Sequence, residues 1–195
     1  MNENVLLALA GFALATSITP GPNNLMLLAS GANFGLRRSV PHMLGISLGH
    51  SFMIVLVGLG LMRAFEFWPV LHTTMKIVGI AYLLWLAWKI ARAAPPKDGT
   101  AEGRPFTFIQ AAAFQWVNPK GWFMAVTALS VYAPSKNVGA ILLVAAVFAI
   151  VNLPSILLWA SAGQTIRRFL TSPSRLRTFN WTMAGLLVAS LVLLI

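Results

Sequence analysis

The sequence contains no cysteine and only four acidic residues among its 195. Without cysteine the chain has no disulfide, no thiol nucleophile and no cysteine-based zinc or iron–sulfur site. Charged residues make up 9% of the chain and hydrophobic residues 58%. This leaves too little charge to cover the surface of a soluble domain of this size, so the composition is that of a chain embedded in lipid.

Several enzyme signatures are also missing from the sequence. It has no phosphate-binding loop of the form Gly-x-x-x-x-Gly-Lys-Ser/Thr, no His-Glu-x-x-His zinc motif and no Gly-x-Ser-x-Gly nucleophile turn. We therefore expect no enzymatic activity, no cofactor and no metal, and an energy source that is an ion gradient or the gradient of the substrate. The net charge is +10, but the basic residues form short clusters between apolar runs, which argues against a nucleic-acid partner.

Six apolar runs come close to the roughly 20 residues that a helix needs to cross about 30 Å of hydrocarbon. They predict an all-α polytopic membrane protein. The predicted spans are Val5–Ala29, Val40–Met62, Val70–Trp88, Phe106–Tyr132, Val138–Ser161 and Phe179–Ile195. The residues before the first run include an acid and no Lys or Arg. Because a cleavable signal peptide begins with basic residues, we expect the first run to remain as a span.

Basic residues gather on one side of the predicted spans. Ten follow the first, third and fifth spans, and three lie on the alternate side. The ten are Arg37, Arg38, Lys89, Arg92, Lys97, Arg104, Arg167, Arg168, Arg175 and Arg177. The three are Arg63, Lys76 and Lys136. Because cytoplasmic loops carry the excess of Lys and Arg, the sequence predicts that both termini are periplasmic.

A polar stretch divides the chain into two halves. Residues 91–105 contain Pro95-Pro96-Lys97-Asp98-Gly99 and are predicted to be a cytoplasmic linker between residues 1–90 and residues 106–195. Three spans in each half force the second half to cross the membrane in the opposite sense. The sequence therefore predicts one integral membrane domain built from two inverted three-helix repeats, an architecture of secondary transporters.

Helix-breaking residues interrupt the first and fourth spans at matching places in the two halves. The interruptions are Thr19-Pro20-Gly21-Pro22-Asn23-Asn24 and Asn118-Pro119-Lys120-Gly121. One proline is often only a kink, but two prolines around a glycine favour true unwinding. Backbone groups freed by a break survive in a membrane only beside a cavity or a ligand. The predicted substrate-binding residues are Thr19, Pro20, Gly21, Pro22, Asn23, Asn24, Asn118, Pro119, Lys120 and, in the fifth span, Asn152.

Lys120 is the only basic residue in the interior of a predicted span. Charge at that depth is unfavourable by at least about 2.5 kcal/mol, so it requires a water-filled cavity or an anionic partner. All acidic residues fall in predicted tails or loops; they are Glu3, Glu66, Asp98 and Glu102. The missing counter-ion is therefore predicted to be the carboxylate of the substrate. The alternative is a lysine that snorkels to an interface.

Two histidines of the second span predict different roles. His50 lies near mid-span and titrates close to neutral pH in water, which suits proton coupling, although a single buried histidine is more often a satisfied polar contact. Lys120 is the other candidate for proton coupling, because burial disfavours a charged lysine. His42 lies near the start of the span and is expected at the membrane interface. Gly45 and Gly49 have the spacing at which membrane helices pack closely.

Four segments of the chain resemble the LysE/RhtB family of bacterial amino-acid exporters. They are Ser17-Ile18-Thr19-Pro20-Gly21-Pro22-Asn23-Asn24, Gly35-Leu36-Arg37-Arg38, Gly79-Ile80-Ala81-Tyr82-Leu83-Leu84-Trp85-Leu86-Ala87-Trp88-Lys89 and Asn118-Pro119-Lys120. The similarity runs through nearly the whole chain, and the motifs of the first half are most similar to those of the branch that exports cysteine and O-acetylserine. The resemblance implies a six-span protein of the bacterial inner membrane that moves small amino acids outward against protons. Many similar proteins have Asp where this chain has Asn152, so the acidic proton carrier is absent from that position.

The leading hypothesis is an antiporter that exports small amino acids by alternating access of the two halves. The alternative is a passive channel, or an exporter of another small solute on the same scaffold, because broken helices also line channels. The expected partners are a small amino acid, the lipid bilayer and protons. A chain of 195 residues is small for a transporter, so a homo-oligomer is reasonable. The amino acid itself cannot be named, because backbone N–H groups recognise the carboxylate that all amino acids share.

Overall fold

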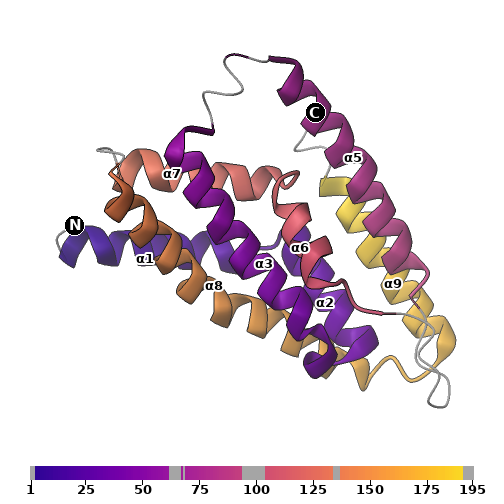
Figure 1. Ribbon diagram of the computed structural model, residues 1–195. Helices are drawn as coiled ribbons and strands as arrows, with labels where there is room; N and C mark the ends of the chain where they lie inside the picture. Colours follow the sequence, from indigo (N-terminus) through magenta and orange to yellow (C-terminus); the bar gives the residue numbers. More distant parts are fainter. Residues whose placement is uncertain (1–2, 62–66, 68, 94–103, 134–136, 191–195) are drawn as a thin grey trace.

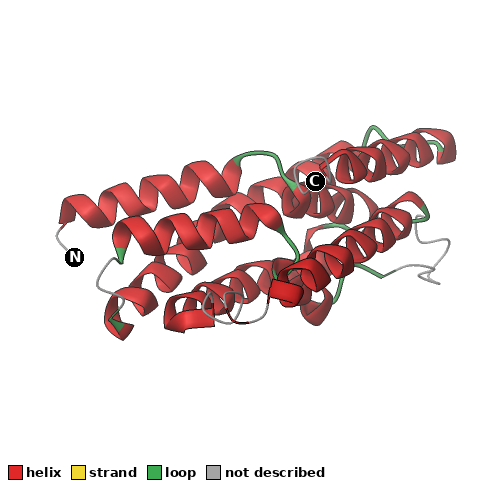
Figure 2. Cartoon of the chain, turned by 90° about the horizontal axis from the view of Figure 1, so that it is seen from above, coloured by secondary structure: helices red, strands yellow, loops and turns green. Residues whose placement is uncertain are grey.

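The computed structural model describes residues 3–61, 67, 69–93, 104–133 and 137–190, and the regular structure in this part of the chain is helical (Figure 1). The elements are α1 (Glu3–Ile18), α2 (Pro22–Phe34), α3 (Leu36–Leu56), the π-helix η1 (Val57–Leu61), α5 (Pro69–Ala91), α6 (Phe108–Gln115), α7 (Pro119–Tyr132), α8 (Val138–Arg167) and α9 (Pro173–Ala189). Together they form an elongated bundle (Figure 2).

The predicted break in the first span is confirmed. Helices α1 and α2 meet at an angle of 58°. Helix α1 ends because Pro20 has no N–H to offer the carbonyl of Thr16, one turn earlier. Helix α2 begins at Pro22, where the missing N–H of a proline costs nothing because the first helical N–H has no partner inside the helix.

The predicted break in the fourth span is confirmed as well. Helix α6 starts with a capping box, in which Thr107 accepts from the Gln110 N–H and the Gln110 side chain accepts from the Thr107 N–H. It ends at Gln115, and tight turns at residues 116–118 lead into α7, which again begins at a proline, Pro119. The two halves of the sequence thus carry breaks of the same kind.

Helices α3 and α8 pack against each other, and the broken helices pack around them. Gly45 and Gly49 of α3 bring that helix against α6; a Cβ on Gly49 would lie 2.6 Å from the Ala112 Cα, which confirms the predicted packing role. Gly163 of α8 also packs closely against α2, because a Cβ added to Gly163 would meet the Leu28 carbonyl. Small residues therefore allow the helices around the breaks to approach at backbone distance.

Helices α8 and α9 differ most from the predicted spans. Helix α8 continues to Arg167, because Pro154 does not break it and a basic side chain in the last turn suits the negative end of the helix dipole. Helix α9 starts already at Pro173, where the Ser172 hydroxyl accepts from the Arg175 N–H as a cap. Local capping therefore extends both helices into segments that apolar content alone assigns to a loop.

The ring of His42 is fully buried and meets the ring of Phe106 edge-on, with the centroids 5.1 Å apart. Phe106 belongs to the segment that precedes α6. A distant part of the chain therefore buries this histidine, while its expected place at the membrane interface stays a prediction.

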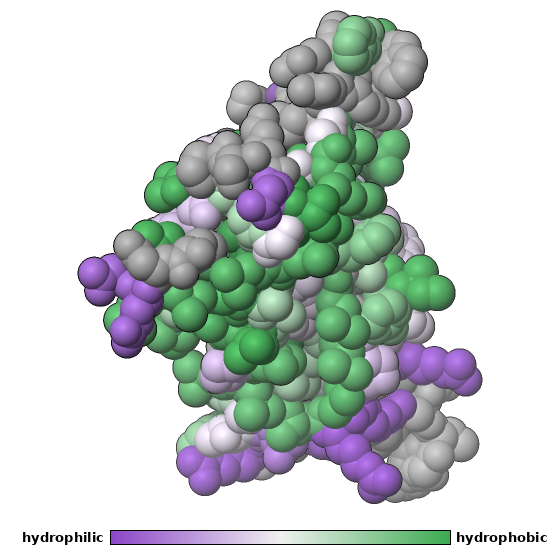
Figure 3. All heavy atoms as spheres, turned by 60° about the vertical axis from the view of Figure 1, so that its left-hand side comes forward, coloured by the Kyte–Doolittle hydropathy of each residue, from purple (hydrophilic) through white to green (hydrophobic). Residues whose placement is uncertain are grey.

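The surface is broadly apolar, and hydrophilic groups gather mainly toward one end of the face seen in Figure 3. Helices long and apolar enough to cross a membrane are Leu36–Leu61, Thr73–Ala91 and Val138–Arg167, and the bent pair α1–α2 makes a fourth span if it is counted as one, within the described residues. The six-span count, the inverted repeat, the domain limits and the periplasmic termini stay predictions. The predicted Pro95–Gly99 linker and the acids Glu66, Asp98 and Glu102 lie outside the described residues.

Candidate functional site

The two breaks meet at the side chain of Lys120. Its ammonium group donates to the Thr19 carbonyl at 2.7 Å, to the Thr19 hydroxyl at 2.8 Å and to the Pro20 carbonyl at 3.5 Å. These oxygens stand at the carboxyl end of α1, where the helix dipole is negative. The charge of Lys120 is therefore held by the break of the other half of the sequence.

Five consecutive carbonyls at the end of α1, from Thr16 to Pro20, each accept a side-chain donor. Lys120 donates to the last two. Asn24 donates to the Ser17 and Thr19 carbonyls at 2.7 and 2.8 Å. The Thr19 hydroxyl donates to the Thr16 carbonyl, and the Trp159 indole N–H donates to the Ile18 carbonyl. The break is consequently satisfied by side chains, and Asn24, a predicted substrate-binding residue, stabilises the backbone through its side-chain N–H groups.

Gly21 leaves the space that Lys120 occupies. A Cβ at this position would lie 2.9 Å from Lys120 Cδ and 3.2 Å from Nζ. The backbone of Gly21 is extended, with φ −175° and ψ 176°, a conformation open to any residue. A larger residue here would therefore push the lysine side chain aside from its present contacts.

A reciprocal amide pair joins the two breaks a second time. Asn23 donates to the Gln115 side-chain carbonyl at 2.9 Å, and Gln115 donates back to the Asn23 side-chain carbonyl at 3.1 Å. Gln115 is fully buried at the last residue of α6. Sequence reasoning missed it because it lies just before the Asn-Pro-Lys motif; the signal was a polar side chain one turn before a break in an apolar run.

A small cavity lies between the breaks and the two central helices. It is lined by Thr16, Ser17, Gly21, Asn23, Asn24, Ile46, His50, Gln115, Asn118, Lys120, Gly121, Met124 and Asn152. Its volume is about 30 Å³, which is room for about two water molecules. Seven predicted residues therefore come together here, including Asn152 and His50 from α8 and α3. Thr19, Pro20, Pro22 and Pro119 flank the cavity without lining it.

Two polar atoms at this cavity are buried and have no hydrogen-bond partner within the described part of the chain. They are the side-chain oxygen of Asn118 and the hydroxyl of Ser17. His50 differs, because its Nε2 donates to the Gly121 carbonyl at 3.2 Å and its ring meets Phe148 edge-on. Buried polar groups without partners are costly, so Asn118 and Ser17 leave hydrogen-bonding capacity on the wall of this cavity.

Comparison with known proteins agrees with this arrangement. A family model described as LysE type translocator matches residues 14–195. The chain belongs to the LysE family. It is similar to cysteine/O-acetylserine efflux proteins of Klebsiella pneumoniae (33% identical over 194 residues, 96% of this chain and 95% of that protein) and of Escherichia coli K12 and Shigella sonnei (each 33% over 193 residues, 96% of both chains). No solved structure matches.

Membership in the LysE family confirms the predicted resemblance and the class of protein. This LysE chain is a helical, multi-pass membrane transporter and not an enzyme. The described residues contain no group of three or more potential metal ligands. Helices α2 and α7 both begin at the cavity with a proline and without a side-chain cap, so their first N–H groups and positive dipole ends are available to an anion.

Proposed function

We propose that the chain exports small amino acids or close derivatives, such as cysteine and O-acetylserine, across the bacterial inner membrane. The efflux proteins that it resembles support this substrate class. The observation that carries the proposal is Lys120, a cation whose partners at the breaks are neutral oxygens. A substrate carboxylate is a stronger partner for an ammonium group than a carbonyl or hydroxyl, because charge-assisted hydrogen bonds have about twice the strength.

The same contact connects binding with movement. When a carboxylate takes the ammonium from Thr19, Lys120 no longer ties α7 to the end of α1. The carboxylate gains the first N–H groups of α2 and α7 as further donors, and the unpartnered side-chain oxygen of Asn118 can accept from the substrate ammonium. Substrate binding therefore exchanges a contact between the two breaks for contacts with the ligand.

The cavity is too small for an amino acid, so transport requires a second conformation. We propose that the site widens to admit the substrate and opens to either side of the membrane by alternating access. The packing supports two inverted three-helix halves, because α1 packs on α8 and α6 packs on α3. In each case the first part of a broken helix contacts the second span of the other half, as inverted repeats require.

Protons are the proposed coupling ion. His50 and Lys120 both line the cavity, and Asn152 stands there as a neutral amide. A substrate carboxylate and a proton would then share one site at different stages of the cycle. Exchange of this kind needs no second ion pathway and agrees with the absence of acidic residues from the predicted spans.

Counterflow in proteoliposomes tests the proposed function. Vesicles loaded with unlabelled O-acetyl-L-serine should accumulate the labelled compound transiently from the medium, with a rate that saturates. A passive channel would show no such accumulation, because it does not couple the two fluxes. A panel of labelled amino acids then identifies the substrate, and a panel that yields no saturable flux at any pH gradient would refute the proposal.

Replacing Gly21 with alanine tests the role of Lys120 without removing its charge. We expect export to slow by about tenfold, because the added methyl displaces the lysine and costs hydrogen bonds to a charged group, each of about 1.5–3 kcal/mol. Initial efflux rates at matched protein levels provide the measurement. Gly11→Ala in α1 is the control, because nothing lies within 4 Å of a Cβ there. Equal rates in both variants would contradict the contact.

A further inference from the structure

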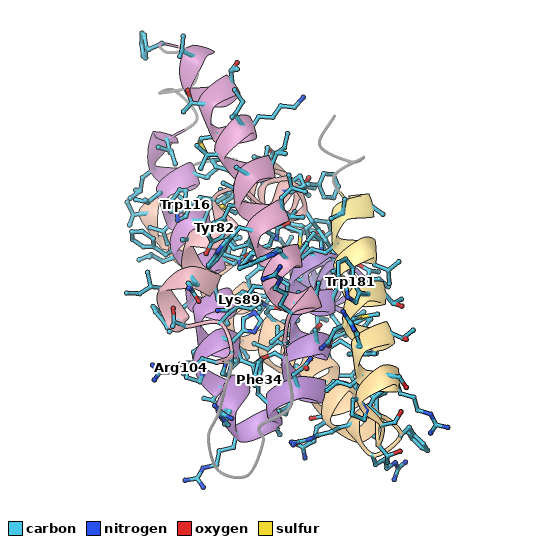
Figure 4. The ribbon with its side chains drawn as sticks, turned by 90° about the vertical axis from the view of Figure 1, so that its right-hand side faces the viewer. Phe34, Tyr82, Lys89, Arg104, Trp116 and Trp181 are labelled. Atoms are coloured by element: carbon cyan, nitrogen blue, oxygen red, sulfur yellow. The ribbon has the colours of Figure 1, made fainter. Side chains whose placement is uncertain are left out.

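A second cavity lies at the far end of α2 and contains cations that the proposed mechanism does not use. Its lining includes Ser30, Asn33 and Phe34 of α2, Lys89 near the end of α5, and Arg104 and Phe106 from the segment before α6. Its volume is about 20 Å³. Figure 4 shows Phe34, Lys89 and Arg104 on this side of the molecule.

Lys89 has hydrogen-bonding capacity to spare. Its ammonium group donates to the Gln110 side-chain carbonyl at 3.3 Å and lies 4.5 Å from the centre of the Phe106 ring. That oxygen already accepts from the Thr107 N–H at 3.1 Å. An ammonium group has three donors, so one long, shared hydrogen bond and an aromatic face leave Lys89 able to bind an anion.

Arg104 adds a second positive charge to the same cavity. Within the described residues it makes no hydrogen bond or ion pair. The one acidic side chain among the described residues is Glu3, which lies in the first turn of α1 and does not line this cavity. Asn33 is a neutral amide and is engaged in a reciprocal pair with Asn180, at 2.7 and 3.0 Å. Among the described residues the cavity is therefore lined by two cations and by no carboxylate.

Helix α2 connects this cavity with the first one. Asn23 lines the first cavity and Asn33 the second, and ten residues of helix separate them by about 15 Å. Met26, which lines the second cavity, and Phe114 are almost completely buried in one apolar cluster. Helix α2 therefore runs beside packed apolar side chains from the cavity that contains Lys120 to the cavity that contains Lys89 and Arg104.

We propose that the second cavity is the loading vestibule of the exporter, where Lys89 and Arg104 receive the carboxylate of a small amino acid before it reaches Lys120. This inference rests on the proposed function. The vestibule lies at the end of the molecule that the distribution of basic residues assigns to the cytoplasm. Because a small neutral amino acid is a zwitterion without net charge, the two cations act at short range by binding its carboxylate, and dissolved salt weakens this attraction by screening and by competition.

Uptake of labelled O-acetyl-L-serine into everted membrane vesicles measures loading from this side. The double variant Lys89→Gln/Arg104→Gln should raise KM by about tenfold and leave the maximal rate within about twofold. Potassium chloride should raise the wild-type KM and have little effect on the KM of the variant. A purely structural loss would lower the maximal rate and would not remove the salt dependence.

Three further variants make the test specific. Arg92→Gln, a change in a nearby cation that does not line the cavity, should keep the wild-type KM, and Lys89→Arg should retain it because the charge remains. Asp98→Asn/Glu102→Gln should lower KM or leave it unchanged. An unaltered KM in the double variant, an equal loss in Arg92→Gln, or a KM raised by neutralising the acids would overturn the vestibule. Absence of saturable uptake in the wild type would instead refute the proposed function.

Discussion

Replacing Lys120 with methionine should reduce export by at least about a hundredfold while the protein still inserts into the membrane. Methionine keeps much of the length and apolar body of lysine but cannot bind a carboxylate. A lost hydrogen bond to a charged group costs about 1.5–3 kcal/mol, and Lys120 is proposed to supply more than one such contact. The Thr19 carbonyl keeps its bond from Asn24, so the break itself should persist.

The measurement is efflux of labelled O-acetyl-L-serine from cells or proteoliposomes at equal amounts of inserted protein. Lys76→Met provides the matched control, because Lys76 lies in α5 and lines neither cavity. Its export should equal that of the wild type. Unchanged export by Lys120→Met would remove the lysine from the mechanism, whatever the control does.

Gly163→Ala should be among the most damaging small substitutions for stability. The added Cβ would lie 2.9 Å from the Ala32 nitrogen and would also meet the Leu28 carbonyl, both backbone atoms of α2 that cannot rotate away. Overpacking of this kind costs about 1–3 kcal/mol. We expect the midpoint of thermal unfolding in detergent to fall by about 5–10 °C, with less protein in the membrane.

Gly185→Ala is the control for this substitution. Gly185 lies in α9, and no atom stands within 4 Å of a Cβ built there. Its unfolding midpoint should match that of the wild type or rise slightly, because alanine favours a helix more than glycine does. Equal midpoints for Gly163→Ala and Gly185→Ala would show that α2 and α8 are not in close contact.

The breaks were predictable because their cause is local. A single proline such as Pro154 remains inside its helix, whereas Pro20-Gly21-Pro22 and Asn118-Pro119 combine proline with other poor helix formers and interrupt theirs. The family was predictable for a related reason, because its motifs include these same residues. Features that depend on one residue and its neighbours along the chain are therefore visible in the sequence itself.

The partners of the site residues could not be predicted, because they depend on how the two halves pack. The sequence shows a lysine without a carboxylate, but not that its ammonium group would rest on Thr19. Nor does it show that Gln115 would pair with Asn23, or that His42 would be buried by Phe106. Each of these contacts joins segments far apart in sequence, and no local pattern specifies such a distance.

The capping of α1 bears on how the membrane stays sealed when no substrate is present. A broken helix whose carbonyls were hydrated would draw a file of water into the bilayer, and protons could move along such a file. Here the carbonyls from Thr16 to Pro20 all accept from side chains. The break therefore needs no hydration. A transporter without bound substrate can keep this bend between α1 and α2 without letting protons leak across the membrane.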